Sequence, residues 1–230
     1  HPRTYDQLPA SPREIKPHPY GIELGMLLKM MQDTKSHWLS GFLASEFSRV
    51  SPRVAEEICK GAKLDPQSRP RKVVGADAER LYAAIRGAKI MAPPTDCLSP
   101  IGEEAILAGL YKQIRGEFYT AVTRSPAVYR GNPFVIEVGL AFGSDPAKKR
   151  KETAGDDAPL AEGETSEADG ASELARVIRY ANRVPLLYQQ AACATFKAAL
   201  ETAWKNYGVA QSRRALPAGP MVIFLHMAGV

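Results

Sequence analysis

Two arginines flank the sharpest break in the first third of the chain. Residues 47–60 read Phe-Ser-Arg-Val-Ser-Pro-Arg-Val-Ala-Glu-Glu-Ile-Cys-Lys, and Arg49 and Arg53 stand on either side of the Ser-Pro pair. In that pair Ser51 is a good N-cap and Pro52 a good first helical residue. The backbone N–H groups of a helix N-terminus attract phosphate, and arginine meets phosphate oxygens with a planar fork. The segment indicates either a phosphate contact or a plain helical hairpin with solvated arginines.

Thiols and imidazoles give no second candidate site. The cysteines are an odd number at wide separations, which fits neither a disulfide framework nor zinc-ligand spacing. The histidines do not cluster with them, so we expect buried free thiols and no metal site. These residues are Cys59, Cys97, Cys193, His1, His18, His37 and His226.

The charge distribution favours a polyanionic partner. The whole chain carries a net charge of +5, but residues 145–173 hold nine acidic and four basic side chains, so the remainder carries +10. A basic folded part is typical of nucleic-acid binding, although many basic proteins bind none. No apolar run approaches the roughly 20 residues that span a bilayer, so we expect no membrane partner.

The first 90 residues predict a small all-helical domain. Residues 1–20 hold five prolines and are expected to form an extended connector. Helices are predicted over 21–34, 36–47 and 77–86 from their apolar periodicity, and over 51–61 from the Ser-Pro start and a terminating Gly61. We therefore expect a helical domain over 21–90.

A different pattern begins at Met91. Ser99 and Pro100 predict the start of a helix, and residues 118–123, 174–184 and 220–230 predict strands. Over 134–142 large apolar side chains alternate with smaller or polar ones, which predicts a half-buried strand with one apolar face. The residues Arg130-Gly131-Asn132-Pro133 before that strand predict a turn. Another helix is expected over 188–207, closed by Gly208. The fold class is therefore α+β: the helical module is followed, over 91–230, by one sheet covered on one face by helices, a βαβ layer like that of some ribosomal proteins.

Two features suggest a piece of a longer protein with an insertion. Residues 144–173 are poor in large apolar side chains, so they are expected to be a disordered acidic insertion rather than a domain boundary. The chain starts at His1 and stops inside an apolar run, which we interpret as a truncated C-terminus and an upstream connection.

Three long strings resemble the transducer domain of the B subunit of type IIB DNA topoisomerases (topoisomerase VI). They are Met-Ala-Pro-Pro-Thr-Asp-Cys-Leu-Ser-Pro-Ile-Gly-Glu at 91–103, Thr-Arg-Ser-Pro-Ala-Val-Tyr-Arg-Gly-Asn-Pro-Phe-Val-Ile-Glu-Val-Gly at 123–139 and Arg-Tyr-Ala-Asn-Arg-Val-Pro-Leu-Leu-Tyr at 179–188. The segments 17–25 and 47–60 are similar to that family's helix–two-turns–helix insert. The resemblance covers most of the chain apart from the acidic insertion.

The resemblance implies a part in strand passage through DNA. In this family an ATPase domain dimerises two B subunits on binding ATP and Mg²⁺, and the transducer relays the movement to the A subunit, which cuts both strands of double-stranded DNA. The ATPase motifs are missing from this sequence, so the chain by itself should neither hydrolyse ATP nor cut DNA. The family also implies a cytoplasmic, nucleoid-associated location in a prokaryote.

One family motif transfers residue by residue. Trp204, Lys205 and Tyr207 match the Trp-Lys-x-Tyr motif that the family places near its DNA path. The resemblance implies a phosphate contact from Lys205 with the aromatic residues beside it; alternatively both aromatics are only core-facing helix residues. Weaker DNA candidates are Arg213 and Arg214. For Arg179 and Arg183, which a strand would place on one face, a structural role is favoured.

Two other interpretations remain open. The chain could belong to a non-catalytic B-like partner that scaffolds a Spo11-type DNA-cutting protein without cycling ATP. It could also be a nucleic-acid-binding helical module on an unrelated α+β domain. A readable ATP-binding domain upstream would favour the topoisomerase.

Overall fold

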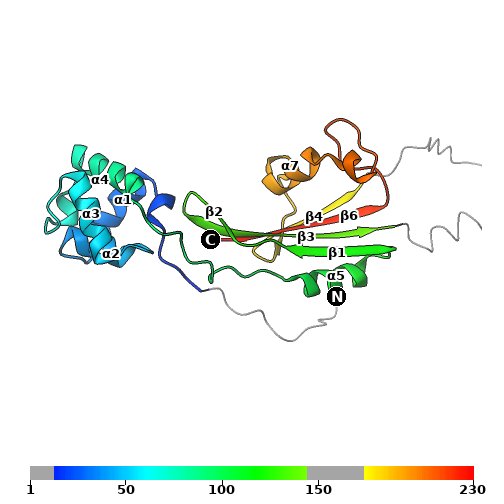
Figure 1. The fold of residues 1–230 in the computed structure, drawn as a ribbon, viewed down its shortest axis with the longest axis horizontal. Coiled ribbons are helices and arrows are strands. Elements are labelled where there is room, and N and C mark those ends of the chain that lie inside the picture. The colour runs from blue at the N-terminus through cyan, green and yellow to red at the C-terminus, as the bar shows by residue number, and fades with distance from the viewer. Residues whose placement is uncertain (1–12, 144–173) are drawn as a thin grey trace, which may run out of the picture. The chain divides into compact units, whose positions relative to one another are not determined.

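The computed structural model describes residues 13–143 and 174–230, and Figure 1 shows its ribbon. It divides into two compact units: residues up to Ser99 with 126–134 and 229–230 form the first, and 100–125 with 135–228 form the second. The insertion expected at 144–173 and the first twelve residues of the expected connector lie outside the described residues.

The first unit is built mainly from short helices. They are η1 (Pro19–Gly21), α1 (Leu24–Asp33), α2 (Leu39–Glu46), α3 (Pro52–Ala62), η2 (Pro70–Lys72) and α4 (Ala76–Gly87). The helices predicted at 21–34, 36–47 and 77–86 are therefore present, with ends displaced by three residues or fewer. The apolar periodicity located them because each helix turns one apolar face inward.

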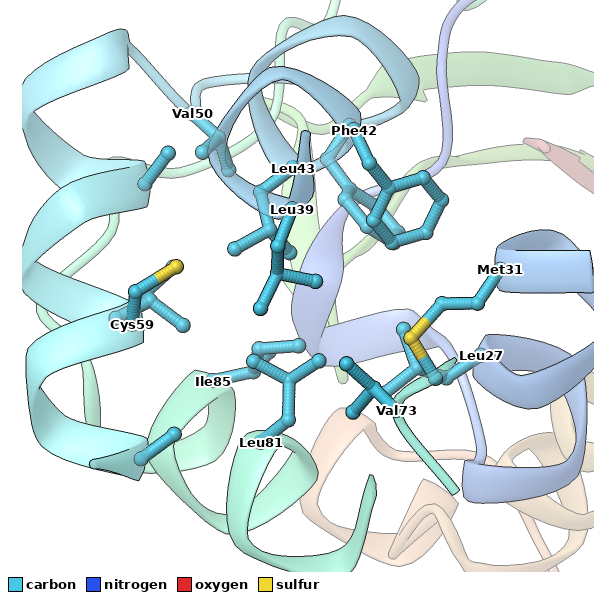
Figure 2. Close-up of a cluster of buried hydrophobic side chains, with 14 of the residues drawn as sticks. Leu27, Met31, Leu39, Phe42, Leu43, Val50, Cys59, Val73, Leu81 and Ile85 are labelled. Atoms are coloured by element: carbon cyan, nitrogen blue, oxygen red, sulfur yellow. The ribbon is translucent and has the colours of Figure 1, made fainter. Parts of the chain in front are cut away.

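A single hydrophobic core holds this unit together. Figure 2 shows the side chains that meet in it, including Leu27 and Met31 from α1, Leu39 and Phe42 from α2, and Leu81 and Ile85 from α4. All six are fully buried. Full burial of one such side chain stabilises the folded state by about 1.5–3 kcal/mol, so this core keeps the short helices folded.

Helix α3 begins as predicted and ends later than predicted. The Ser51 hydroxyl accepts a hydrogen bond from the Val54 N–H, and Pro52 is the first helical residue. The expected stop at Gly61 is wrong, because Lys63 takes the left-handed conformation (φ 56°) and ends the helix instead. Gly61 lies inside the helix, where a β-carbon at its position would lie 3.6 Å from the side chain of Ala84 on α4.

The second unit contains most of a six-stranded mixed sheet. Its strands are β1 (Phe118–Thr123), β2 (Ala127–Tyr129), β3 (Asn132–Phe142), β4 (Arg176–Ala181), β5 (Val184–Pro185) and β6 (Met221–Gly229). The order is β1-β3-β6-β4-β5, with β2 paired to β3. Strands β4 and β6 are parallel, so their connection must cross over the sheet, and it carries α7 (Ala194–Glu201).

Turn residues join two antiparallel pairs of strands. Arg130 and Gly131, between β2 and β3, both have positive φ, as do Asn182 and Arg183 between β4 and β5. Two-residue turns with both φ values positive match the twist of antiparallel strands. The turn chemistry expected at 130–133 is therefore present.

Helices cover both faces of the sheet, where one covered face was expected (Figure 1). Along β6, Ile223 and Leu225 pack in a cluster with Ala199 of α7. The alternate residues Val222 and Phe224 pack in a different cluster, with Ile106 and Leu110 of α5 (Glu103–Gln113). Neighbouring residues on a strand point to opposite faces, so α5 and α7 lie on opposite sides.

The covering by α5 also changes how β3 is buried. The predicted strand is present, but the face with the large apolar side chains is not the more deeply buried one: Val135, Glu137, Gly139 and Ala141 are buried, and their larger neighbours are at most half-buried. A β-carbon on Gly139 would lie 2.6 Å from the Ile106 side chain. The small-residue face of β3 is therefore the one on which α5 rests.

A buried carboxylate sets the start of α5. The expected start at Ser99 and Pro100 is wrong, because the helix begins at Glu103 with Gly102 as its N-cap. The Glu137 carboxylate accepts hydrogen bonds from the backbone N–H groups of Ile101 and Gly102, each at 2.7 Å. A negative charge at a helix N-terminus replaces the capping hydroxyl that the sequence suggested.

Candidate nucleic-acid interface

The long helix expected over 188–207 is broken into three pieces: η3 (Gln190–Ala192), α7, and η4 (Trp204–Tyr207). Trp204 is the reason for the last break. Its backbone N–H is shared by the Thr202 carbonyl and the Gln211 side chain, and its indole N–H donates to the Ala199 carbonyl at 2.7 Å. The Trp-Lys-x-Tyr motif therefore lies on a single 3₁₀ turn, which Gly208 (φ 76°) closes as predicted.

The three motif side chains face different surroundings. Trp204 is half-buried and packs against the cluster of Met221 and Ile223, so it anchors the turn to the sheet. Lys205 is exposed, and Tyr207 is 75% exposed. The lysine and the tyrosine can therefore reach a ligand, while the tryptophan holds the turn that carries them.

Gln211, which the sequence analysis did not single out, fixes the loop that faces this turn. Its side-chain NH₂ donates to the carbonyl oxygens of Leu200 and Ala215, at 3.1 and 3.0 Å. Its side-chain oxygen accepts the N–H of Trp204 at 3.2 Å. One amide thus ties the end of α7, the start of η4 and the following loop together, and the only sequence signal for it was a polar residue in a loop.

A basic groove lies between these segments, with a volume of about 570 Å³. The sequence analysis named Lys205, Arg213 and Arg214 separately, and the structure brings them together here. The full lining is Lys197, Leu200, Glu201, Thr202, Ala203, Lys205, Gln211, Ser212, Arg213 and Arg214. With four cations and one carboxylate, the groove suits an anion.

The other predicted phosphate contacts lie in the first unit. Arg49 occupies the turn before α3 with a positive φ of 61°, and Arg53 is on the first turn of the helix. Arg53 forms an ion pair with Glu57 at 3.1 Å, one helical turn along, and its side chain is 89% exposed. An exposed pair of this kind is weak enough to open for a phosphate.

Arg179 and Arg183 take structural positions. Arg179 is 6% exposed and donates to the carbonyl oxygens of Leu186 and Tyr188, so it holds the segment after β5 against β4. Arg183 lies in the turn after β4 rather than on the strand, and its guanidinium donates to the Pro100 carbonyl. These hydrogen bonds agree with the structural role that we favoured for both arginines.

Cys193, just before α7, is the one thiol with a lowered pKa among the described residues. Burial would raise its pKa, but hydrogen bonds from the Thr195 hydroxyl, the Phe196 N–H and Arg179 outweigh burial and lower the pKa to about 7. By contrast, burial raises the pKa of Cys59 to about 11.

Across residues 13–143 and 174–230 there is no group of three or more His, Cys, Asp or Glu side chains that could hold a metal ion. In the same residues no helix is long and apolar enough to cross a membrane.

Comparison with known proteins defines the family. The family model described as "Topoisomerase VI B subunit, transducer" matches residues 93–230. Relatives named as the B subunit of type 2 DNA topoisomerase 6 are 42% identical in Methanosarcina mazei, 45% in Methanococcoides burtonii and 42% in Archaeoglobus fulgidus. The alignments cover 98–99% of this chain and 33–34% of the relatives, so the chain spans about a third of their length. The chain belongs to the family of topoisomerase VI B subunits, with a transducer domain over 93–230.

Proposed function

We propose that this chain is part of the B subunit of an ATP-dependent type IIB DNA topoisomerase, in which it relays ATP-driven dimerisation to the DNA-cleaving A subunit. The observation that carries the proposal is the transducer match over 93–230. It is supported by sequence identity of 42–45% to the named subunits along nearly the whole chain. A sheet buried on both faces suits a relay, because a tightly packed layer transmits a displacement rather than absorbing it.

The partners and cofactors follow from the same proposal. They are double-stranded DNA, the A subunit, a second B subunit, and ATP with Mg²⁺ in the complete subunit. We assign neither ATP nor Mg²⁺ to any residue of this chain. The proposed location is cytoplasmic and nucleoid-associated, in a prokaryote.

The test uses the complete subunit that carries this chain, mixed with its A subunit, supercoiled plasmid, Mg²⁺ and ATP. We expect the plasmid to relax only when both subunits and ATP are present. Double-strand cleavage without ATP hydrolysis or relaxation would overturn the proposal and favour a non-catalytic partner of a Spo11-type protein. The transducer match already argues against a helical module on an unrelated α+β domain.

The second part of the proposal is a phosphate contact from Lys205, supported by Trp204 and Tyr207. The exposed lysine sits on a turn that the tryptophan anchors, which gives a mobile cation a fixed base. Removing one contact between a protein cation and a phosphate lowers the steepness of the salt dependence of duplex binding, the salt slope, by about 0.9. Lys205→Gln should show this change in a duplex titration at several salt concentrations, and an unchanged slope would reject the contact.

The third part is a phosphate contact from the helical unit. Arg49 and Arg53 flank the start of α3, where the helix dipole also favours an anion. If both arginines contact phosphate, the double change to Gln should lower the salt slope by about 1.8. The matched control is Lys29→Gln, an exposed cation on a different helix, α1. Equal slopes for the double variant and the control would leave the plain helical hairpin as the better interpretation.

A further inference from the structure

The basic groove defined above contains three cations that the family motif does not include. Lys197 belongs to α7, Arg213 and Arg214 to the loop before β6, and all three line the groove together with Lys205 of η4. The described residues contain no ion pair that engages any of these four side chains. A groove with four such cations and one carboxylate, Glu201, holds an excess of positive charge.

We propose that this groove is a phosphate cradle for duplex DNA, in which Lys197, Arg213 and Arg214 extend the Lys205 contact over neighbouring phosphates. The inference rests on the proposed function, because it takes DNA as the partner. Arginine offers paired N–H groups to phosphate oxygens, and lysine adds a mobile point charge.

Two uncharged polar side chains of the groove are already engaged within the protein. The Gln211 amide is occupied on both its nitrogen and its oxygen. The Thr202 hydroxyl donates to the Ala198 carbonyl at 2.8 Å. Of the groups that commonly read base edges, the amide here is not available. Because phosphate contacts carry no sequence information, a cradle whose arginines hold phosphates should bind unrelated sequences equally.

Gln211 also holds together the segments that carry the cations. Its bonds to Leu200 and Ala215 join the two walls of the groove, and Arg214 adopts a positive φ of 56° in the loop that Gln211 holds. Cations held in place before binding lose less conformational entropy when the ligand arrives. The groove is thus organised by the fold and not by its ligand.

The first experiment measures the salt dependence of duplex binding by the 230-residue chain. The triple variant Lys197→Gln, Arg213→Gln, Arg214→Gln keeps most of each side-chain stem, and circular dichroism checks that it folds. Three lost phosphate contacts should lower the salt slope by about 2.7, so that the affinity loss between 50 and 200 mM salt shrinks about 40-fold. The control Lys112→Gln, an exposed cation at the end of α5, should leave the slope unchanged.

The outcomes separate the two proposals. If Lys205→Gln lowers the slope and the triple variant does not, the Lys205 contact stands and the cradle is refuted. If neither variant changes the slope, the proposed Lys205 contact fails and the cradle fails with it. A slope change for the triple variant that differs between two unrelated duplex sequences would also overturn the cradle, since phosphate contacts carry no sequence information.

A second variant changes the affinity in the opposite direction, which damage to the fold would not do. Glu201 places a carboxylate in the groove, so Glu201→Gln should tighten duplex binding by about 1.5- to 5-fold, the range of exposed charge pairs. Glu104→Gln, on the exposed face of α5, removes the same charge outside the groove and should have no effect. Unchanged or weaker binding by Glu201→Gln refutes the cradle.

Discussion

Replacing Glu137 by glutamine should strongly destabilise the sheet unit. The Glu137 carboxylate is fully buried and accepts four hydrogen bonds. One oxygen accepts from the Gly102 N–H and the Thr123 hydroxyl, both at 2.7 Å. The other accepts from the Ile101 N–H at 2.7 Å and from Nδ1 of His226 at 2.6 Å. These bonds join β3, β6, the end of β1 and the start of α5 at one point.

The expected magnitude follows from the geometry. Glutamine has nearly the same shape, but its NH₂ group replaces one oxygen and faces two donors. Two buried donors lose their acceptor at about 1–3 kcal/mol each, so we expect a loss of about 2–6 kcal/mol in the free energy of unfolding. With a urea slope of about 2 kcal/mol per M, the midpoint should fall by about 1–3 M.

The assay is urea unfolding followed by tryptophan fluorescence. The chain has two tryptophans, Trp38 in the helical unit and the half-buried Trp204 in the sheet unit. In a Trp38→Phe background the signal reports on the sheet unit alone. Glu104→Gln removes an exposed carboxylate from the first turn of α5 in the same unit, and should lower the midpoint by at most about 0.5 M.

The pH dependence gives a second readout of the same carboxylate. Burial would raise the pKa of Glu137, but the hydrogen bonds from Ile101, Thr123, Gly102 and His226 outweigh burial and hold the pKa below its ordinary value. A carboxyl with a lowered folded pKa contributes stability above its unfolded pKa of about 4.3 and loses it as the pH falls through the folded value. The difference in urea midpoint between the unchanged protein and Glu137→Gln should therefore become smaller below about pH 4.3. Equal midpoints at pH 7, or a gap that widens in acid, would refute this account.

Three further predictions concern other parts of the chain. Gly139→Ala puts a methyl group into the contact with α5 and should lower the free energy of unfolding by about 1–3 kcal/mol, measured in the same urea assay. Ser51→Ala removes the cap on the Val54 N–H and should lower the stability of the helical unit by about 0.5–2 kcal/mol, read by Trp38 fluorescence, while Ser51→Thr should restore most of it. Since the thiolate forms above the pKa, iodoacetamide should label Cys193 at a rate that rises through about pH 7 and leave Cys59, with a pKa of about 11, unmodified at pH 8; equal labelling would contradict the two pKa shifts.

Local sequence signals located many of the elements. Ser51 and Pro52 gave the start of α3, and Arg130-Gly131 gave a turn, because capping and positive φ depend on the residue and its immediate neighbours. The apolar periodicity found the helices of the first unit for a similar reason, since one helix face carries the pattern by itself.

Two of the differences from the sequence-based expectations involve contacts between residues far apart in the chain. Ser99 and Pro100 had the local signature of a helix start, but the carboxylate of Glu137, about 35 residues away in sequence, caps α5 three residues later. The alternation along β3 predicted one buried face, and α5 buries the other face more deeply. Periodicity reports the chemistry of one segment and cannot report what packs on top of it.

For the candidate interface, too, some features follow from the sequence and others only from the folded chain. The sequence was enough to specify the family, through long strings of residues, and it singled out Lys205 within the Trp-Lys-x-Tyr motif and pointed to Arg213 and Arg214. The folded chain was needed to show that these cations line one groove with Lys197 and Glu201, and that Trp204 anchors the turn beneath them. This difference arises because a groove is a relation between two walls. Gln211 joins those walls through hydrogen bonds to Leu200 and Ala215, and no local pattern in the sequence specifies that pairing.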